Sequence, residues 1–316
     1  MTSRTVARHA RHLSRLGLIR ITVLIASALV VLGACGSPGE SSDPSASSGA
    51  TFKVVATTTV FADIIQHVGG DRVSVASIIP PGVGPEDYEA KPDDAKKLTD
   101  AQLVVSNGVG LDDFLDRLLR SAGGEHPRLV LGDGIPTLAV DGVENPHFWL
   151  DPTLVKQYYI PAIAARLSEL DPDGTATYDA NATAYGAELD ALDAELKTKI
   201  EEIPAADRKL VTSHDAFPYF ARHFGFELVG VILENPGQDP SAADLAALVD
   251  RVKAAHVRAV FSEAQFSPKL SETLADEAGI SQVVTNLYND ALGDAPADTY
   301  VGLMRWNVDQ IVPALK

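Results

Sequence analysis

Short runs of β-branched residues alternate with longer amphipathic stretches along the chain from Thr51 onward. A first series of such runs covers residues 52–56, 73–79, 103–106 and 128–131, with helical patterns that begin near Val60, Asp93 and Asp112. A second series covers residues 210–213, 227–231, 259–262 and 282–285, with helical patterns from Ala216, Ser241 and Pro268. Strands that alternate with helices are typical of βαβ units on a parallel sheet. The pattern therefore predicts an α/β protein with two similar lobes, each a mainly parallel sheet flanked by helices.

One long helical face separates the two series. Its apolar residues recur at spacings of three and four: Tyr178, Ala182, Tyr185, Leu189, Leu192, Leu196, Ile200 and Ile203. This spacing indicates a helix of about 26 residues, or about 39 Å at 1.5 Å per residue. We expect an N-terminal lobe at residues 51–171, a linker helix at 172–203 and a C-terminal lobe at 204–316. A single rigid helix between the lobes restricts hinge motion.

The first 35 residues have the pattern of an export signal. A start with five arginines and no acidic residue precedes an apolar run of twelve residues, 21–32, and then Gly33-Ala34-Cys35. That run is shorter than the ~20 residues that a permanent membrane helix needs. Leu-Gly-Ala-Cys resembles the cleavage box of bacterial lipoproteins, in which the cysteine becomes the lipidated first residue. The alternative is an ordinary secretory signal with an incidental cysteine, but the place of Cys35 at the end of the run favours lipidation.

The segment after Cys35 is predicted to be a tether. Residues 36–50 (GSPGESSDPSASSGA) are rich in Ser, Gly and Pro, and such a segment is flexible with a span of roughly 20 Å. We therefore expect a signal peptide at 1–34, and a lipidated cysteine with its tether at 35–50, on the extracytoplasmic face of the cell membrane. Loss of the five arginines takes the formal net charge from -17 to -22. An acidic chain disfavours nucleic-acid binding, which requires a basic surface.

Two of the eight histidines have unusual surroundings. His147 lies in NPHFWLDP (residues 145–152), where prolines fix the backbone on both sides. His214 follows a predicted strand, and α/β folds place their ligand sites at the carboxyl ends of strands. Imidazole nitrogens bind transition metals, although a single histidine is more often a hydrogen-bonded structural residue. His67, His223 and His256 fall on predicted helices, where surface or packing roles are expected.

Six ordered segments resemble one protein family. They are PPGVGPEDYEAKPDD (80–94), LVVSNGVGL (103–111), NPHFWLDP (145–152), VTSHDAF (211–217), FSEAQFSPKLSE (261–272) and LYNDALG (287–293). Across essentially all of residues 52–316 the chain is similar to the metal-specific solute-binding proteins that serve zinc and manganese ABC importers. The resemblance implies a metal site in a cleft between the lobes, a lipid-anchored monomer, and an ABC permease with its ATPase as partners.

The resemblance also implies four metal ligands, with one departure from the family pattern. Three of them fall on His147, His214 and Asp290. The first ligand of the family is usually a histidine in Asp-Pro-His-x-Tyr-Glu, whereas this chain has Gly-Pro-Glu-Asp-Tyr-Glu at 84–89. The aligned residue is Glu86, and a carboxylate also binds metal ions.

Two points about this ligand set stay open in the sequence. Glu86 is either the fourth ligand or a solvated loop acid beside a three-ligand site, and Asp87 or Glu89 is an alternative to it. Glu263 matches a family position near a strand end, where it either supports the ligands from behind or has a structural role only.

The donor set bears on the choice of metal. Two imidazoles and two carboxylates favour Mn²⁺ slightly over Zn²⁺, with Fe²⁺ as a third candidate, because oxygen-rich sites suit manganese. Intrinsic affinity still follows the Irving–Williams order, in which zinc binds more tightly than manganese. However, many zinc-specialised relatives have a histidine-rich loop where residues 123–144 of this chain contain a single histidine, His126. We expect a binding protein that captures one divalent transition metal for an importer.

Two other classes of function are alternatives. One is an adhesive or sensory lipoprotein that binds metal, and the other is a metallohydrolase. A hydrolase needs an open coordination position for water, and nothing in the sequence resembles a general base beside one. We therefore expect no enzymatic activity.

Overall fold

The computed structural model describes residues 51–86, 88–140, 142–234 and 237–316. The predicted signal peptide, Cys35 and the tether lie outside the described residues, as does Asp87. None of the helices in the described ranges has the length and hydropathy that crossing a membrane requires.

The N-terminal lobe is built on a parallel sheet of order β2-β1-β3-β4. Its strands are β1 (Phe52–Ala56), β2 (Val73–Ser77), β3 (Leu103–Ser106) and β4 (Arg128–Val130). Successive side chains of a strand point to opposite faces of the sheet. Val54 and Ala56 therefore enter one apolar cluster, while Val55 enters another on the opposite face. The strands expected at 52–56 and 103–106 are confirmed.

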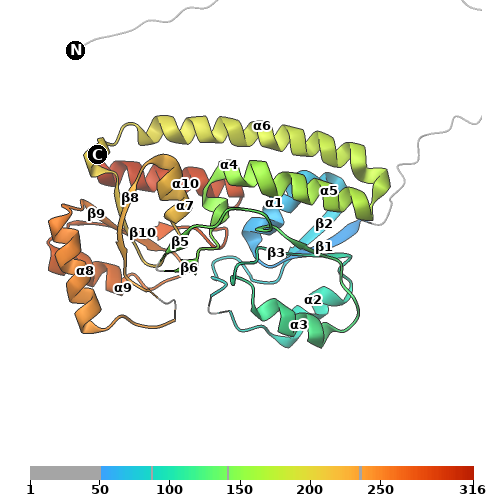
Figure 1. Cartoon of the computed structure of the whole chain (residues 1–316), viewed down its shortest axis with the longest axis horizontal. Helices are drawn as coiled ribbons and strands as arrows, with labels where there is room; N and C mark the ends of the chain where they lie inside the picture. Colours follow the sequence, from blue (N-terminus) through green and yellow to red (C-terminus); the bar gives the residue numbers. More distant parts are fainter. Residues whose placement is uncertain (1–50, 87, 141, 235–236) are drawn as a thin grey trace, which may run out of the picture. The chain divides into compact units, whose positions relative to one another are not determined.

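Helices cover both faces of this sheet (Figure 1). α1 (Thr59–Gly69) and α5 (Ile160–Leu170) pack on one face, and α2 (Pro92–Thr99) and α3 (Phe114–Ala122) pack on the other. α1 follows the N-cap Thr58, and its buried stripe includes Phe61 and Ile64. Shorter elements of this lobe are the turn η1 (Gly70–Arg72), the hairpin β5 (Ala139–Val140) and β6 (Val143–Glu144), η2 (Phe148–Leu150), α4 (Pro152–Leu154) and the π-helical turn η3 (Val155–Tyr159).

The C-terminal lobe contains two parallel strand pairs. β7 (Lys209–Thr212) pairs with β8 (Glu227–Val231), and β9 (Ala259–Glu263) pairs with β10 (Gln282–Leu287). β7 and β9 lie beside each other, and polar groups join them where the strands end. The Ser213 hydroxyl donates to Ser262 Oγ at 3.0 Å, and the Ser213 N–H donates to Glu263 Oε1 at 3.3 Å. At this edge of the lobe, side-chain hydrogen bonds therefore hold the strands together in addition to the backbone hydrogen bonds within each strand pair.

Helices also cover both sides of these strands. α8 (Ala242–Ala254) and α9 (Lys269–Ala278) share one apolar cluster with Val211 and Val260, whereas α7 (Pro218–Phe224) and α10 (Tyr300–Leu315) join the largest cluster with Leu210 and Phe261. Ser241, where a helix was expected to begin, is the N-cap of α8 and accepts a hydrogen bond from the Asp244 N–H.

The largest apolar cluster contains residues of both lobes. The last part of the chain crosses to the first: the Leu292 N–H donates to Thr59 Oγ1 at 2.8 Å, and the Tyr300 N–H donates to Asp63 Oδ2 at 2.8 Å. Thr59 and Asp63 both belong to α1. The two lobes therefore share one continuous core, and moving one lobe against the other would expose apolar surface.

α6 (Thr175–Ile200) confirms the expected long helix. It has 26 residues and is therefore about 39 Å long. It follows the turn η4 (Pro172–Gly174), and the turn η5 (Ala205–Asp207) leads from it towards β7. Figure 1 shows α6 running along both lobes, where it packs against α1 and α5 of the first lobe and α10 of the second.

The three histidines expected on helices divide into two groups. His67 lies in α1 and His223 in α7, as expected. The expectation for His256 is wrong, because α8 ends at Ala254 and His256 lies in the following turn with a φ of 53°. Positive φ is incompatible with a right-handed helix.

The buried face of α6 gives a test of the shared core. Leu192 is fully buried, and replacing it with alanine removes apolar contacts and leaves a cavity. We expect Leu192→Ala to lower the free energy of unfolding by about 2–5 kcal/mol. Denaturant titration measures the change. Thr198→Ala, on the exposed face of the same helix, is the control and should change stability by no more than about 0.5 kcal/mol. Equal effects would contradict a packed role for this helix.

Candidate metal centre

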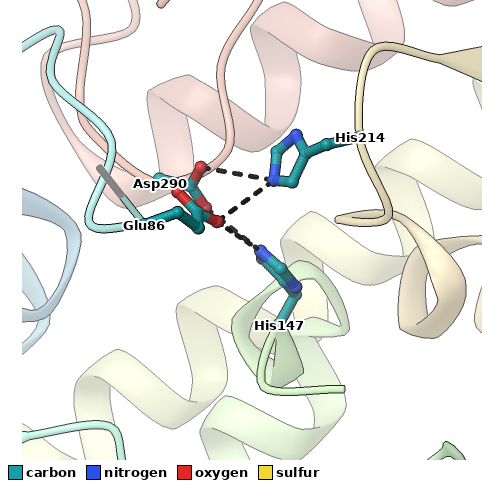
Figure 2. A group of neighbouring side chains, drawn as sticks. All are labelled: Glu86, His147, His214 and Asp290. Atoms are coloured by element: carbon teal, nitrogen blue, oxygen red, sulfur yellow. Dashed lines mark ion pairs between the residues drawn. The ribbon is translucent and has the colours of Figure 1, made fainter. Parts of the chain in front are cut away.

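Glu86, His147, His214 and Asp290 lie together where the two lobes meet. One nitrogen or carboxylate oxygen from each lies within 4.8 Å of the others, and Figure 2 shows the four side chains pointing toward one another. Glu86 and His147 come from the first lobe, while His214 and Asp290 follow β7 and β10 of the second. Ligand sites of α/β sheets lie at the carboxyl ends of strands. The chain thus brings together all four residues that the family resemblance singled out.

The spacing of the donor atoms suits a small central cation. Glu86 Oε1 lies 3.5 Å from His147 Nε2 and 3.3 Å from His214 Nε2. The Asp290 carboxylate lies 3.4 Å and 3.5 Å from the same two nitrogens. The distance to His147 is measured from Asp290 Oδ1, and the distance to His214 is measured from Asp290 Oδ2. With all four donor groups within 4.8 Å of one another, one small cation can contact a nitrogen or oxygen of each residue.

Burial differs among the four side chains. Those of His147, His214 and Asp290 are 6%, 3% and 0% exposed, whereas that of Glu86 is 20% exposed. Glu86 as a whole residue is exposed, so its backbone faces solvent while its carboxylate turns inward. This orientation argues against a solvated loop acid. Glu89, the alternative to Glu86, is exposed and lies outside the group.

Burial and the neighbouring charges shift the pKa values of these side chains. Burial raises the pKa of Glu86, but the imidazoles of His147 and His214 that face its carboxylate outweigh burial and hold this pKa well below its usual range. Burial lowers the pKa of His214, yet the neighbouring carboxylates, first Glu263 and then Glu86, raise it well above its ordinary value. Burial and the charge of Glu86 both raise the pKa of Asp290. A divalent cation bound here would replace imidazole protons as the balancing positive charge.

His147 is oriented by Asn145. The amide oxygen of Asn145 accepts from the His147 N–H at 3.0 Å and lies 3.1 Å from His147 Nδ1. The amide nitrogen of Asn145 donates in turn to the Asp215 backbone oxygen at 2.6 Å. Because Nδ1 can donate to this oxygen only as N–H, the neutral ring keeps its Nε2 lone pair for the centre of the group.

His214 is backed by Glu263. His214 Nδ1 lies 3.5 Å from Glu263 Oε2, and Glu263 is fully buried. The other oxygen of Glu263 accepts the Ser213 N–H, which holds the carboxylate in place. A carboxylate behind a histidine fixes the ring's tautomer and orientation in metal sites. The structure thus places Glu263 behind His214, on the side away from the other three residues.

Three further residues of the site were not singled out in the sequence. Gln265 and Asn289 donate side-chain hydrogen bonds to Asp290 Oδ2. Trp149 Nε1 donates to the Asn289 backbone oxygen at 2.8 Å and fixes the segment that carries Asp290. All three lie in the segments that resemble the family, two of them directly beside or near a proposed ligand. Their positions in those segments are the only sequence signal, since none is an obvious metal ligand.

The chain is similar to known metal-binding proteins over most of its length. The family described as periplasmic zinc-uptake complex component A matches residues 54–314. The manganese-binding lipoprotein MntA of Halalkalibacterium halodurans is 32% identical over 299 residues, covering 93% of this chain and 97% of that protein. The iron-binding protein YfeA of Yersinia pestis is 35% identical over 267 residues, covering 82% and 85%.

Solved structures give the same result for the fold. The periplasmic zinc-binding protein TroA from Treponema pallidum superposes with a TM-score of 0.77 and 32% sequence identity, covering 84% of this chain and 99% of that one. The likeness therefore extends over both lobes and the helix between them. On the family match and these relatives, the chain belongs to the family of periplasmic zinc-uptake complex component A proteins.

Proposed function

We propose that this protein captures one divalent transition-metal ion outside the cytoplasmic membrane and delivers it to an ABC importer. The observation that carries the proposal is the group of two imidazoles and two carboxylates between the lobes, with nitrogen–oxygen distances of 3.3–3.5 Å. A permease and its ATPase are the proposed partners, and the protein acts as a monomer. Relatives named as substrate-binding lipoproteins of manganese and iron ABC transporters support this function.

We propose Glu86, His147, His214 and Asp290 as the four metal ligands. Their donor types favour Mn²⁺ slightly over Zn²⁺, and Fe²⁺ is the third candidate. Relatives carry names that specify manganese, iron or zinc, so family membership alone does not select among these metals.

The proposed location is the outer face of the cell membrane, with a lipid on Cys35 as the anchor. Relatives that are named lipoproteins support this part of the proposal. The same names support import over an adhesive or sensory role and over hydrolysis. No contact within the described residues favours either alternative, so import is the single function that we propose.

Binding of a cation between the lobes should stabilise the folded chain. A ligand that binds only the folded state contributes about 2.7 kcal/mol at a hundredfold excess over its dissociation constant. We expect the melting temperature of demetallated protein to rise with Mn²⁺ and with Zn²⁺, as measured by calorimetry, and Mg²⁺ to have little effect because it prefers all-oxygen sites. Melting curves unmoved by Mn²⁺, Zn²⁺ and Fe²⁺ would exclude the proposed receptor. Import itself requires that cells lacking this protein take up less of the bound metal.

Glu86 is the ligand by which this chain departs from its family. Glu86→Gln keeps the size of the side chain and removes its charge, so we expect metal affinity to fall by more than about a hundredfold, the upper range for residues that act behind a ligand. Glu86→His should shift preference from Mn²⁺ towards Zn²⁺, because imidazole suits zinc better than carboxylate does. Competition titration at fixed pH measures both, since protons compete for the ligands. Glu89→Gln is the matched control, and equal affinities for the Glu86→Gln variant and wild type would remove Glu86 from the site.

Substitution of Glu263 tests whether its carboxylate orients the His214 ring for metal binding. In Glu263→Gln, an amide N–H facing His214 Nδ1 would favour the tautomer that carries its proton on Nε2. We therefore expect metal affinity to fall by about 10–100-fold, as for other outer partners of histidine ligands. Glu272→Gln, an exposed position on α9, should leave affinity unchanged. A loss of stability without any loss of affinity would assign Glu263 a structural role only.

A further inference from the structure

The two oxygens of Asp290 have different surroundings. Oδ2 accepts a hydrogen bond from Gln265 Nε2 at 2.7 Å and another from Asn289 Nδ2 at 3.0 Å. Oδ1 is buried, has no hydrogen-bond partner among the described residues, and lies 3.4 Å from His147 Nε2. A carboxylate oxygen has two lone pairs. Oδ2 also faces His214 Nε2 at 3.5 Å, but its two lone pairs are engaged by amide N–H groups, whereas Oδ1 has no such donor and is free to meet a cation.

The orientation of the two amides follows from their neighbours. Gln265 Nε2 faces two acceptors, Asp290 Oδ2 and, at 2.9 Å, Asn289 Oδ1. Only an NH₂ group can donate to both. The amide nitrogen of Asn289 in turn lies 3.3 Å from His214 Nε2. The two side chains form one chain of hydrogen bonds that ends on Asp290 and His214.

The backbone around both amides is held in place. Gln265 lies in the turn that follows β9, where the Ala264 N–H donates to the Leu287 carbonyl at 2.8 Å and the Phe266 N–H donates to the Glu263 carbonyl at 3.0 Å. Asn289 is fully buried, and its carbonyl accepts from Trp149 Nε1. Gln265 is half-buried, and its amide donates to the fully buried Asp290. This geometry keeps an N–H donor directed at Oδ2.

We propose that Gln265 is a specificity-determining residue: its side-chain amide, together with that of Asn289, withholds Oδ2 so that Asp290 offers the cation one oxygen. This inference rests on the proposed function. Each oxygen withheld lowers the coordination number that the site provides. Zn²⁺ is satisfied by four ligands in a tetrahedron, whereas Mn²⁺ favours octahedral, oxygen-rich coordination. Gln265 thus shifts the metal preference of the site towards Zn²⁺, whereas two bidentate carboxylates would shift this preference towards Mn²⁺.

The test removes the donor and keeps the length of the side chain. Gln265→Met is compared with Gln282→Met, which changes an exposed glutamine at the other end of β10 from the site. Dissociation constants for Mn²⁺ and Zn²⁺ are measured by competition on the demetallated full-length protein, and the coordination number of each metal is measured by X-ray absorption. In Gln265→Met we expect the ratio of the two constants to shift about tenfold towards Mn²⁺, the lower end of what outer partners contribute, with an added oxygen in the metal's first coordination sphere. Asn289→Leu, which removes the second donor, should shift the ratio in the same direction.

Three results would decide against the inference. Equal weakening for both metals, with an unchanged coordination number, would make Gln265 a structural residue. Constants unchanged from wild type would show that Oδ2 is not withheld. A lower melting temperature of Gln265→Met does not disturb the test, because loss of folded protein weakens the binding of both metals alike. In that case the ratio of the Mn²⁺ and Zn²⁺ dissociation constants is measured for Gln265→Ala as well. Wild-type protein that binds neither metal would instead overturn the proposed function, and this inference with it.

Discussion

Two carboxylates buried side by side repel each other unless positive charge lies between them, and the rest of this structure holds Glu86 and Asp290 in that arrangement. The imidazoles of His147 and His214 supply the charge in the absence of a cation, which is why their pKa values are raised and that of Glu86 is lowered. The attraction between these groups is electrostatic, but their spacing is not set by it. Asn145 and Glu263 fix the two rings from behind, and the amides of Gln265 and Asn289 fix the Asp290 carboxylate.

The spacing can persist because both lobes share one core. α6 runs along the whole length of that core, and α10 returns from the second lobe to contact α1 of the first. Trp149 links the two halves of the site directly: its indole donates to the Asn289 carbonyl, and its own carbonyl accepts from the Tyr300 hydroxyl. Rigid-body opening of the lobes would break these buried hydrogen bonds and expose apolar surface, so the site is preformed in the folded chain.

Strand positions and the long helix could be predicted from the sequence, since alternation and three-and-four spacing report local structure. α10 has the same spacing of buried residues, but periodicity could not show that it packs against the other lobe. The two-residue strands β5 and β6 are too short to alternate visibly. The convergence of Glu86, His147, His214 and Asp290 was anticipated only through the family resemblance. The sequence places Gln265 and Asn289 in family-like segments, but it could not show that their amides engage Asp290 Oδ2, because that contact depends on side-chain rotamers set by tertiary contacts.

One feature of the site bears on kinetics. Of the four converging side chains, only Glu86 stands on a segment with an exposed backbone, between β2 and α2, and the other three are enclosed. If the lobes do not part and Glu86 is a ligand as proposed, a bound ion would leave past this segment, and its residence time would depend on how often the Glu86 side chain turns outward. Pro80, Pro81 and Pro85 restrict the conformations open to this segment, because each fixes its own φ. Slow exchange with solvent, ended by contact of this segment with the proposed permease, would let the protein keep its metal ion until it reaches that permease.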